Sequence, residues 1–172
     1  SLSQRIIDRY KSMYTGVFYN RYILGEWCVA EGLVYDFGED NIVDEIPSNG
    51  EYYISIDYGT MNPFSAGLWC VLGDKATRIK EYYYNGREKA VQRTDEDYCD
   101  SVEELAKGYN IRQIVVDPSA ASFIAALRRR GFTIRKANND VLDGIRRTAE
   151  NLKNGNIKIH RSCVDAIAEF GL

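Results

Sequence analysis

Two aspartates stand directly after apolar, β-rich stretches of the sequence, where carboxylates can do chemistry. Asp57 ends the run 52–57, and Asp117 follows the run 111–116. If these runs are neighbouring strands of one sheet, both carboxylates converge at the same end of it. Facing carboxylates repel each other, and Mg²⁺ or Mn²⁺, which favours oxygen ligands, relieves that repulsion. The pair therefore predicts a divalent-metal site.

The chemistry expected of such a site is phosphodiester hydrolysis without a nucleophilic side chain. Two metal ions roughly 3.5 to 4 Å apart can activate a water molecule and stabilise the leaving oxygen. Each aspartate also has a simpler interpretation, because Asp before Tyr58-Gly59-Thr60 or before Pro118 commonly forms a turn with local backbone N–H groups. The hypothesis therefore depends on the pair and not on either residue alone.

The surrounding elements must place the two aspartates side by side. Alternating β-rich runs predict strands at 52–57, 65–72 and 77–84, with Gly73-Asp74 as a hairpin turn between the last two. Helical spacing and capping residues predict helices after Thr94, over 119–130 and from 139 or 140 to 153, with strands at 111–116 and 132–135 between them. A helix over 3–14, an extended piece at 157–160 and a final segment at 164–170 complete the pattern.

This order of elements indicates the fold class. Three antiparallel strands followed by alternating helix and parallel strand predict an α/β, ribonuclease H-like mixed sheet flanked by helices. We assign residues 1–48 to an N-terminal connector and packing segment. Residues 49–172 form the predicted ribonuclease H-like domain.

Charge is distributed unevenly along the chain. The net charge is −3, but residues 118–161 hold ten Lys and Arg against three Asp and Glu, a balance of +7, which leaves −10 for the rest. A basic segment of this kind can bind the phosphate backbone of DNA. The alternative is that its arginines only solvate a helix end and favour the helix dipole. The candidate DNA-binding residues are Arg128, Arg129, Arg130, Arg146 and Arg147.

Several classes of protein are disfavoured by the sequence. No apolar run approaches the roughly 20 residues that span a bilayer, and the first residues lack the features of a signal peptide, so we expect no membrane partner and a cytoplasmic location. The four cysteines are widely spaced and predict neither a zinc site nor a disulfide framework. Neither nucleotide-binding glycine motif occurs in the chain.

Several segments, in this order and spacing, resemble the large subunit of phage terminases, particularly the prophage type of Gram-positive bacteria. The resemblance begins at about Tyr19. The matching segments are Tyr22-Ile-Leu-Gly-Glu-Trp27, Ala30-Glu-Gly-Leu-Val-Tyr35, Ser55-Ile-Asp-Tyr-Gly-Thr60 with Asn62-Pro63, Val115-Val-Asp-Pro-Ser119, and Gly144-Ile145.

The resemblance implies a metal-dependent nuclease that cuts concatemeric double-stranded phage DNA during packaging in the bacterial cytoplasm. It implies the terminase ATPase domain, the small terminase subunit and the portal as partners. Asp57 and Asp117 match the first two metal-binding carboxylates of the family. The third acid of the family lies in a helix well downstream, so either it lies beyond Leu172 or Asp143 replaces it. The resemblance thus implies that residues 49–172 are a nuclease domain that lacks its C-terminal end.

Two other functions stay open at this point. The stretch from Asp57 to Thr60 resembles the Asp-x-Gly-Thr phosphate motif of actin-like and sugar-kinase ATPases, which need a second, similar domain. The chain could also be a non-catalytic docking module, with an acidic half that meets the portal or motor and a basic half that follows DNA. Metal-dependent cleavage favours the nuclease, nucleotide binding favours the kinase-like fold, and neither activity is expected of the docking module.

Overall fold

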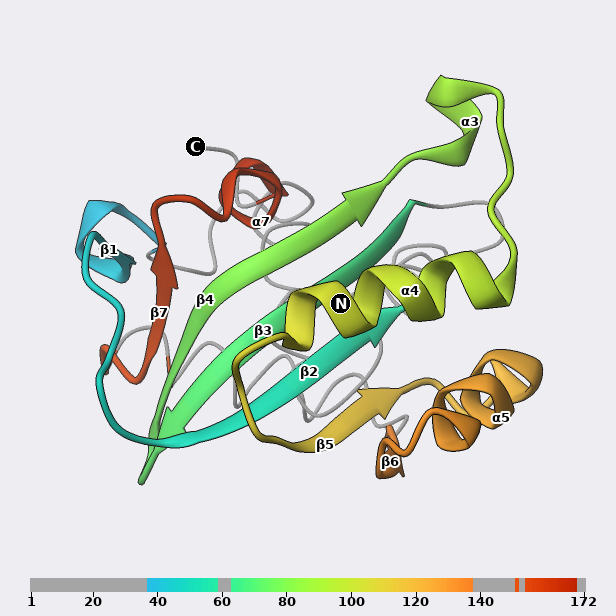
Figure 1. Cartoon of the computed structure of the whole chain (residues 1–172). Helices are drawn as coiled ribbons and strands as arrows, with labels where there is room; N and C mark the ends of the chain where they lie inside the picture. The colour runs from blue at the N-terminus through green and yellow to red at the C-terminus, as the bar shows by residue number, and fades with distance from the viewer. Residues whose placement is uncertain (1–36, 59–62, 138–150, 152–153, 170–172) are drawn as a thin grey trace, which may run out of the picture.

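A seven-stranded mixed sheet forms the centre of the protein (Figure 1). The computed structural model describes residues 37–58, 63–137, 151 and 154–169. Its strand order is β1-β7-β4-β3-β2-β5-β6. The strands are β1 (Ile42–Val43), β2 (Glu51–Asp57), β3 (Phe64–Leu72), β4 (Lys75–Tyr84), β5 (Ile111–Val116), β6 (Ile134–Lys136) and β7 (Ile157–His160).

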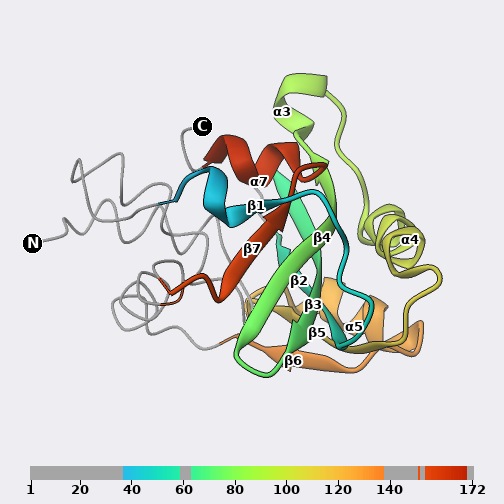
Figure 2. The same ribbon diagram turned by 90° about the vertical axis from the view of Figure 1, so that its left-hand side faces the viewer.

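Helices lie on both sides of this sheet. The short 3-10 helix η1 (Glu39–Asn41) precedes β1, and α3 (Gly86–Lys89) follows β4. The longer helices α4 (Asp95–Ala106) and α5 (Ala121–Arg129) pack on one side, while α7 (Val164–Glu169) lies on the other (Figure 2). Among the described residues, no helix has the length and apolar character needed to cross a bilayer.

The predicted order of strands and helices from residue 51 to 136 is confirmed. Strands β2, β3 and β4 form an antiparallel meander, and β5 pairs in parallel with β2 after the α4 crossover. Gly73 adopts a φ of +60° in the β3–β4 turn, as a tight hairpin requires. The capping box at Thr94 is also present, because its hydroxyl accepts from the Asp97 N–H while the Asp97 carboxylate accepts from the Thr94 N–H.

Apolar side chains on one face of the sheet form the core beneath α4 and α5. Alternation along β2 and β5 directs Ile54, Ile56, Ile114 and Val116 into this core, where each is fully buried. The amphipathic helices complete it with Tyr98, Cys99, Val102, Leu105, Phe123, Ile124 and Leu127. The core therefore fixes β2 and β5 against the same two helices.

The structure adds features that the sequence did not predict. Strand β7 lies between β1 and β4 and is parallel to both, so residues 42–43 of the connector segment join the same sheet. Helix α3 interrupts the connection from β4 to α4. The predicted helix over 3–14 lies outside the described residues, as does nearly all of the helix predicted to end at 153.

The face of the sheet opposite α4 holds a buried ion pair. The Arg78 guanidinium donates to the Glu81 carboxylate at 3.1 and 3.2 Å, and the two side chains are only 2% and 7% exposed. Glu81 also accepts from the backbone N–H groups of Asp165 and Ala166, at 2.8 and 3.3 Å. Strand β4 is thereby joined to the first turn of α7.

Asp165 lies against this ion pair, and its charge opposes folding. Burial, followed by the neighbouring Glu81 carboxylate, raises the pKa of Asp165. Because the folded-state pKa is above the unfolded-state value, the cost of the charged form is present above the folded pKa and disappears below about 3.9. We expect Asp165→Asn to raise the melting temperature at pH 7 and to leave it nearly unchanged at about pH 3. Equal gains at both pH values would contradict this explanation.

Candidate active site

The two aspartates occupy equivalent positions on neighbouring parallel strands. The β2–β5 pairing ends with Ile56 opposite Val116, and the next residue on each chain is Asp57 and Asp117 respectively. Both strands run in the same direction, so both carboxylates lie at the same end of the sheet. The predicted adjacency of the two positions is confirmed, and it is set by the pairing of the two backbones.

Asp57 is the more buried of the two. It pairs with Ser65 of β3, it is 8% exposed, and alternation along β2 places it on the same face as Ser55. A buried carboxylate is costly unless hydrogen bonds or a cation stabilise its charge. Its oxygens are hard donors of the kind that Mg²⁺ and Mn²⁺ prefer.

Asp117 lies just beyond β5 in a local turn. Its Oδ1 accepts from the Ser119 N–H at 2.8 Å, and its backbone carbonyl accepts from the Ala120 N–H at 3.1 Å. The turn-forming interpretation of this residue is therefore correct for one carboxylate oxygen. The turn also fixes the rotation of the side chain, and among the described residues no hydrogen bond to Oδ2 is found, so that this oxygen can serve as a ligand.

Carboxylates from neighbouring strands suit a divalent cation, since each contributes fixed oxygen atoms. Within residues 37–58, 63–137 and 154–169, however, no cluster of three or more acidic, His or Cys side chains could hold a metal ion. Asp143, the third candidate ligand, lies outside the described residues. Among the described residues, the candidate ligands for a metal at this site are thus Asp57 and Asp117 alone.

Behind the two aspartates, an aromatic cluster and one carboxylate join the loops that carry them. The Tyr58 ring lies 4.9 to 5.9 Å from the rings of Phe64, Tyr98 and Phe123. Its hydroxyl donates to Asp95 Oδ1 at 2.6 Å, and the Ser122 hydroxyl donates to Asp95 Oδ2 at 2.7 Å. Burial, followed by the hydrogen bond to Asp95, raises the pKa of Tyr58, which keeps the hydroxyl protonated as a donor.

The candidate DNA-binding arginines at the end of α5 differ in their surroundings. Arg130 donates to Glu96 at 2.7 Å and to Asp100 at 2.6 Å, and it lies 3.2 Å from Glu103, with its side chain 21% exposed. Arg129 is 67% exposed and makes one longer contact, 3.4 Å, to Glu96. Arg128 has no ion pair among the described residues. Arg146 and Arg147 lie outside them.

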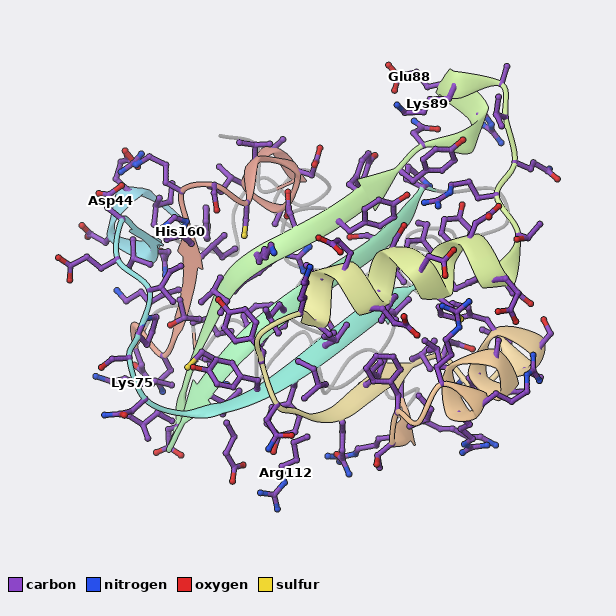
Figure 3. All side chains as sticks on the ribbon, viewed as in Figure 1. Asp44, Lys75, Glu88, Lys89, Arg112 and His160 are labelled. Carbon is purple, nitrogen blue, oxygen red and sulfur yellow. The ribbon has the colours of Figure 1, made fainter. Side chains whose placement is uncertain are left out.

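Other basic side chains lie at different ends and edges of the sheet. Arg87 and Lys89 are exposed on α3, which follows the end of β4 and lies at the same end of the sheet as Asp57, since Tyr84 pairs with Phe64. Lys75, the first residue of β4, lies at the other end of the sheet, and Arg112 lies near the start of β5 (Figure 3). His160 is at the β1–β7 edge, where its ring contacts Ser162 and the Asp44 carbonyl (Figure 3).

The strand order and the α4 and α5 crossovers define the class of this protein as ribonuclease H-like. The same fold occurs in the nuclease domain of the P22 large terminase, which is 13% identical, with 81% of this chain and 77% of that chain covered at a TM-score of 0.60. At this identity the comparison shows the fold alone.

The sequence identity is higher to the large terminase from a thermophilic bacteriophage, which is known from several crystal structures. The ADP complex is 39% identical to this chain, with 98% of this chain and 44% of that chain covered at a TM-score of 0.73. A second crystal form is 40% identical, with 99% and 43% covered at a TM-score of 0.74. No protein-family model and no curated protein matches the chain.

The chain is thus a relative of the phage terminase large subunits, as the sequence motifs predicted. It spans less than half of the large terminase of the thermophilic bacteriophage, 44% of that chain. Its ribonuclease H-like sheet is the fold of a terminase nuclease domain.

Proposed function

We propose that this chain is a divalent-metal-dependent endonuclease that cuts concatemeric double-stranded phage DNA during genome packaging. The observation that carries the proposal is the placement of Asp57 and Asp117 at the same end of two paired parallel strands, in a sheet of the terminase nuclease type. Similarity to the large terminase of the thermophilic bacteriophage supports the biological setting. The enzyme would act in the host bacterial cytoplasm.

Asp57 and Asp117 would hold Mg²⁺ or Mn²⁺, in a site for two ions. When bound, the ions supply an activated water molecule and charge stabilisation for the scissile phosphate and the leaving oxygen. Asp57 would act from a buried, rigid strand end. Asp117 would act from a turn in which Ser119 already holds one of its oxygens. Both carboxylates are ligands, and no side chain attacks the phosphate.

DNA would bind through its phosphate backbone to the basic surface of residues 118–161. The proposed contacts are Arg128, Arg129, Arg130, Arg146 and Arg147. Within this group the ion pairs of Arg130 with α4 compete with phosphate, so its contribution should be the smallest of the described arginines. The remaining partners, in keeping with a terminase large subunit, would be the ATPase domain, the small terminase subunit and the portal.

Replacing Arg128, Arg146 and Arg147 together by Ala should weaken binding to unrelated duplexes about equally. For each phosphate that the protein no longer neutralises, the slope of log affinity against log salt concentration should flatten by roughly 0.9, because fewer counterions are released. The measurement is a fluorescence-anisotropy titration of duplex DNA at several salt concentrations.

A matched control removes three cations from the far end of the sheet. Lys75 is the first residue of β4, Lys107 follows α4, and Arg112 lies in the first half of β5. Their replacement by Ala changes the net charge equally, yet it should leave the salt slope unchanged. Equal effects of the two triple variants would show that total charge, and not the proposed surface, governs binding.

The nuclease proposal is tested by plasmid nicking, with the chain and a version extended past Leu172 compared side by side. Two aspartates leave a second ion short of fixed ligands for near-octahedral coordination. We therefore expect weak cleavage by the chain in Mg²⁺, better cleavage in Mn²⁺, none with EDTA, and a gain on extension. The proposal would be overturned if the extended form showed no metal-dependent cleavage, whether it hydrolysed ATP or had no activity.

The same assay decides the third ligand. Asp143→Asn is made in both lengths of the chain. If the short form is already fully active and loses that activity with Asp143→Asn, then Asp143 is the third ligand. If the substitution leaves the extended form active, the acid lies downstream of Leu172.

A further inference from the structure

Asp95 joins the two chain segments that carry the candidate metal ligands. It is the first residue of α4, and each of its carboxylate oxygens accepts a hydrogen bond from a different segment. The Tyr58 hydroxyl donates to Oδ1 at 2.6 Å and the Ser122 hydroxyl donates to Oδ2 at 2.7 Å. Tyr58 directly follows Asp57, and Ser122 lies in the first turn of α5, five residues after Asp117.

These contacts differ from those of an ordinary acidic residue in the first turn of a helix. Such residues are stabilised by the helix dipole and the N–H groups of their own helix. Here the capping role belongs to Thr94 and Asp97, which bond each other's backbone N–H groups. Asp95 instead accepts from two hydroxyls outside α4, at distances typical of charge-assisted O–H···O⁻ bonds.

The Tyr58 side of this bridge is rigid. Its ring packs against Phe64, Tyr98 and Phe123, so the position of its hydroxyl is set by the core. The Asp95 carboxylate thus holds a fixed donor on one segment and a hydroxyl on the other. These two hydrogen bonds restrain the distance between the two segments.

We propose that Asp95 is a positioning residue that sets the separation of the Asp57 and Asp117 carboxylates for metal binding. The inference rests on the proposed function. Mg²⁺ requires near-ideal geometry at about 2.0 to 2.1 Å, and loss of groups that orient metal ligands typically lowers metal affinity by about 10- to 100-fold. Mn²⁺ tolerates poorer geometry, so the loss of Asp95 should weaken the binding of Mg²⁺ more than that of Mn²⁺.

The test is isothermal titration of Mn²⁺ into the chain without DNA, with Asp57→Asn as the reference for binding outside the site. Asp95→Ala should weaken Asp57-dependent binding by about 10-fold or more. Tyr58→Phe removes only a hydroxyl and keeps the ring in the aromatic cluster, while Ser122→Ala removes the other donor. The double variant Tyr58→Phe/Ser122→Ala should reproduce the loss of Mn²⁺ affinity seen with Asp95→Ala. Each single variant should have an affinity between that of the wild type and that of Asp95→Ala.

A second readout separates positioning from stability. In plasmid nicking by a chain extended past Leu172, Asp95→Ala should raise the Mg²⁺ concentration for half-maximal rate more than that of Mn²⁺. The control is Asn41→Ala in η1, where the buried Asn41 amide donates to the Ile157 carbonyl of β7 at 3.2 Å. This variant lowers stability far from the site and should leave Mn²⁺ affinity unchanged.

The outcomes separate the inference from the function on which it rests. Wild-type Mn²⁺ affinity in Asp95→Ala, or an equal loss of affinity in Asn41→Ala, would overturn the positioning role alone. Wild-type protein that binds no Mn²⁺ through Asp57 and cuts no DNA would overturn the proposed function and the positioning role together.

Discussion

Cleavage of plasmid DNA in Mn²⁺ should fall to the level of metal-free protein when Asp57 or Asp117 is replaced by Asn, in an active, extended chain. Each substitution removes a charged oxygen ligand while it keeps the size of the side chain, so the fold should persist. The melting temperature should stay the same or rise, because like-charge repulsion between neighbouring carboxylates is relieved. Activity is measured by plasmid nicking and stability by thermal melting without metal.

Asp74→Asn provides the matched control. Asp74 lies in the exposed β3–β4 turn, at the opposite end of the sheet from Asp57, and its substitution makes the same change in charge. Its cleavage rate should equal that of the wild type. A wild-type rate for either active-site variant would mean that the affected aspartate is not a metal ligand.

Loss of the Glu81 carboxylate should be the most destabilising charge substitution among the described residues. Glu81→Ala leaves the Arg78 guanidinium, 2% exposed, without this carboxylate, and it removes the acceptor for two N–H groups of α7. Removing one partner of a buried ion pair costs about 3 to 5 kcal/mol. Relief of repulsion with Asp165 offsets part of this cost, so we expect about 3 kcal/mol.

The measurement is urea denaturation at pH 7, with Glu51→Ala as the control. Glu51 pairs with Arg112 at 2.5 Å, but the two side chains are 54% and 61% exposed. An exposed pair contributes about 0 to 1 kcal/mol despite its short distance. If the two variants lost the same stability, burial would not be the quantity that matters.

The sequence predicted the central sheet because its signals are local. Runs of β-branched and aromatic residues predict β2, β3 and β4, and the Gly73 turn joins two of them. The order of elements then placed Asp57 beside Asp117, which the register confirms. Strand β7 was predicted only as an extended piece. Its pairings could not be read from four residues, because they join positions 81 apart with β4 and 117 apart with β1.

The contacts around the site could not be predicted, because they depend on how α4 packs against α5. Three arginines in succession resemble a solvated helix end. In the structure Arg130 faces Glu96, Asp100 and Glu103, which share one face of α4 at helical spacing. The bridge from Asp95 to Tyr58 and Ser122 likewise joins three elements that are distant in sequence. The metal-binding roles of Asp57, Asp117 and Asp143 and the DNA contacts remain predictions.

The parallel pairing of β2 with β5 determines when the proposed two-aspartate site can first exist during synthesis. Asp57 and Asp117 are 60 positions apart, and β3, β4, α3, α4 and β5 lie between them. At about 5 to 20 residues per second, a ribosome needs about 3 to 12 seconds to add that stretch. Until then the nascent meander holds only one of the two aspartates. An unfinished chain therefore cannot bring the two aspartates of the proposed site together.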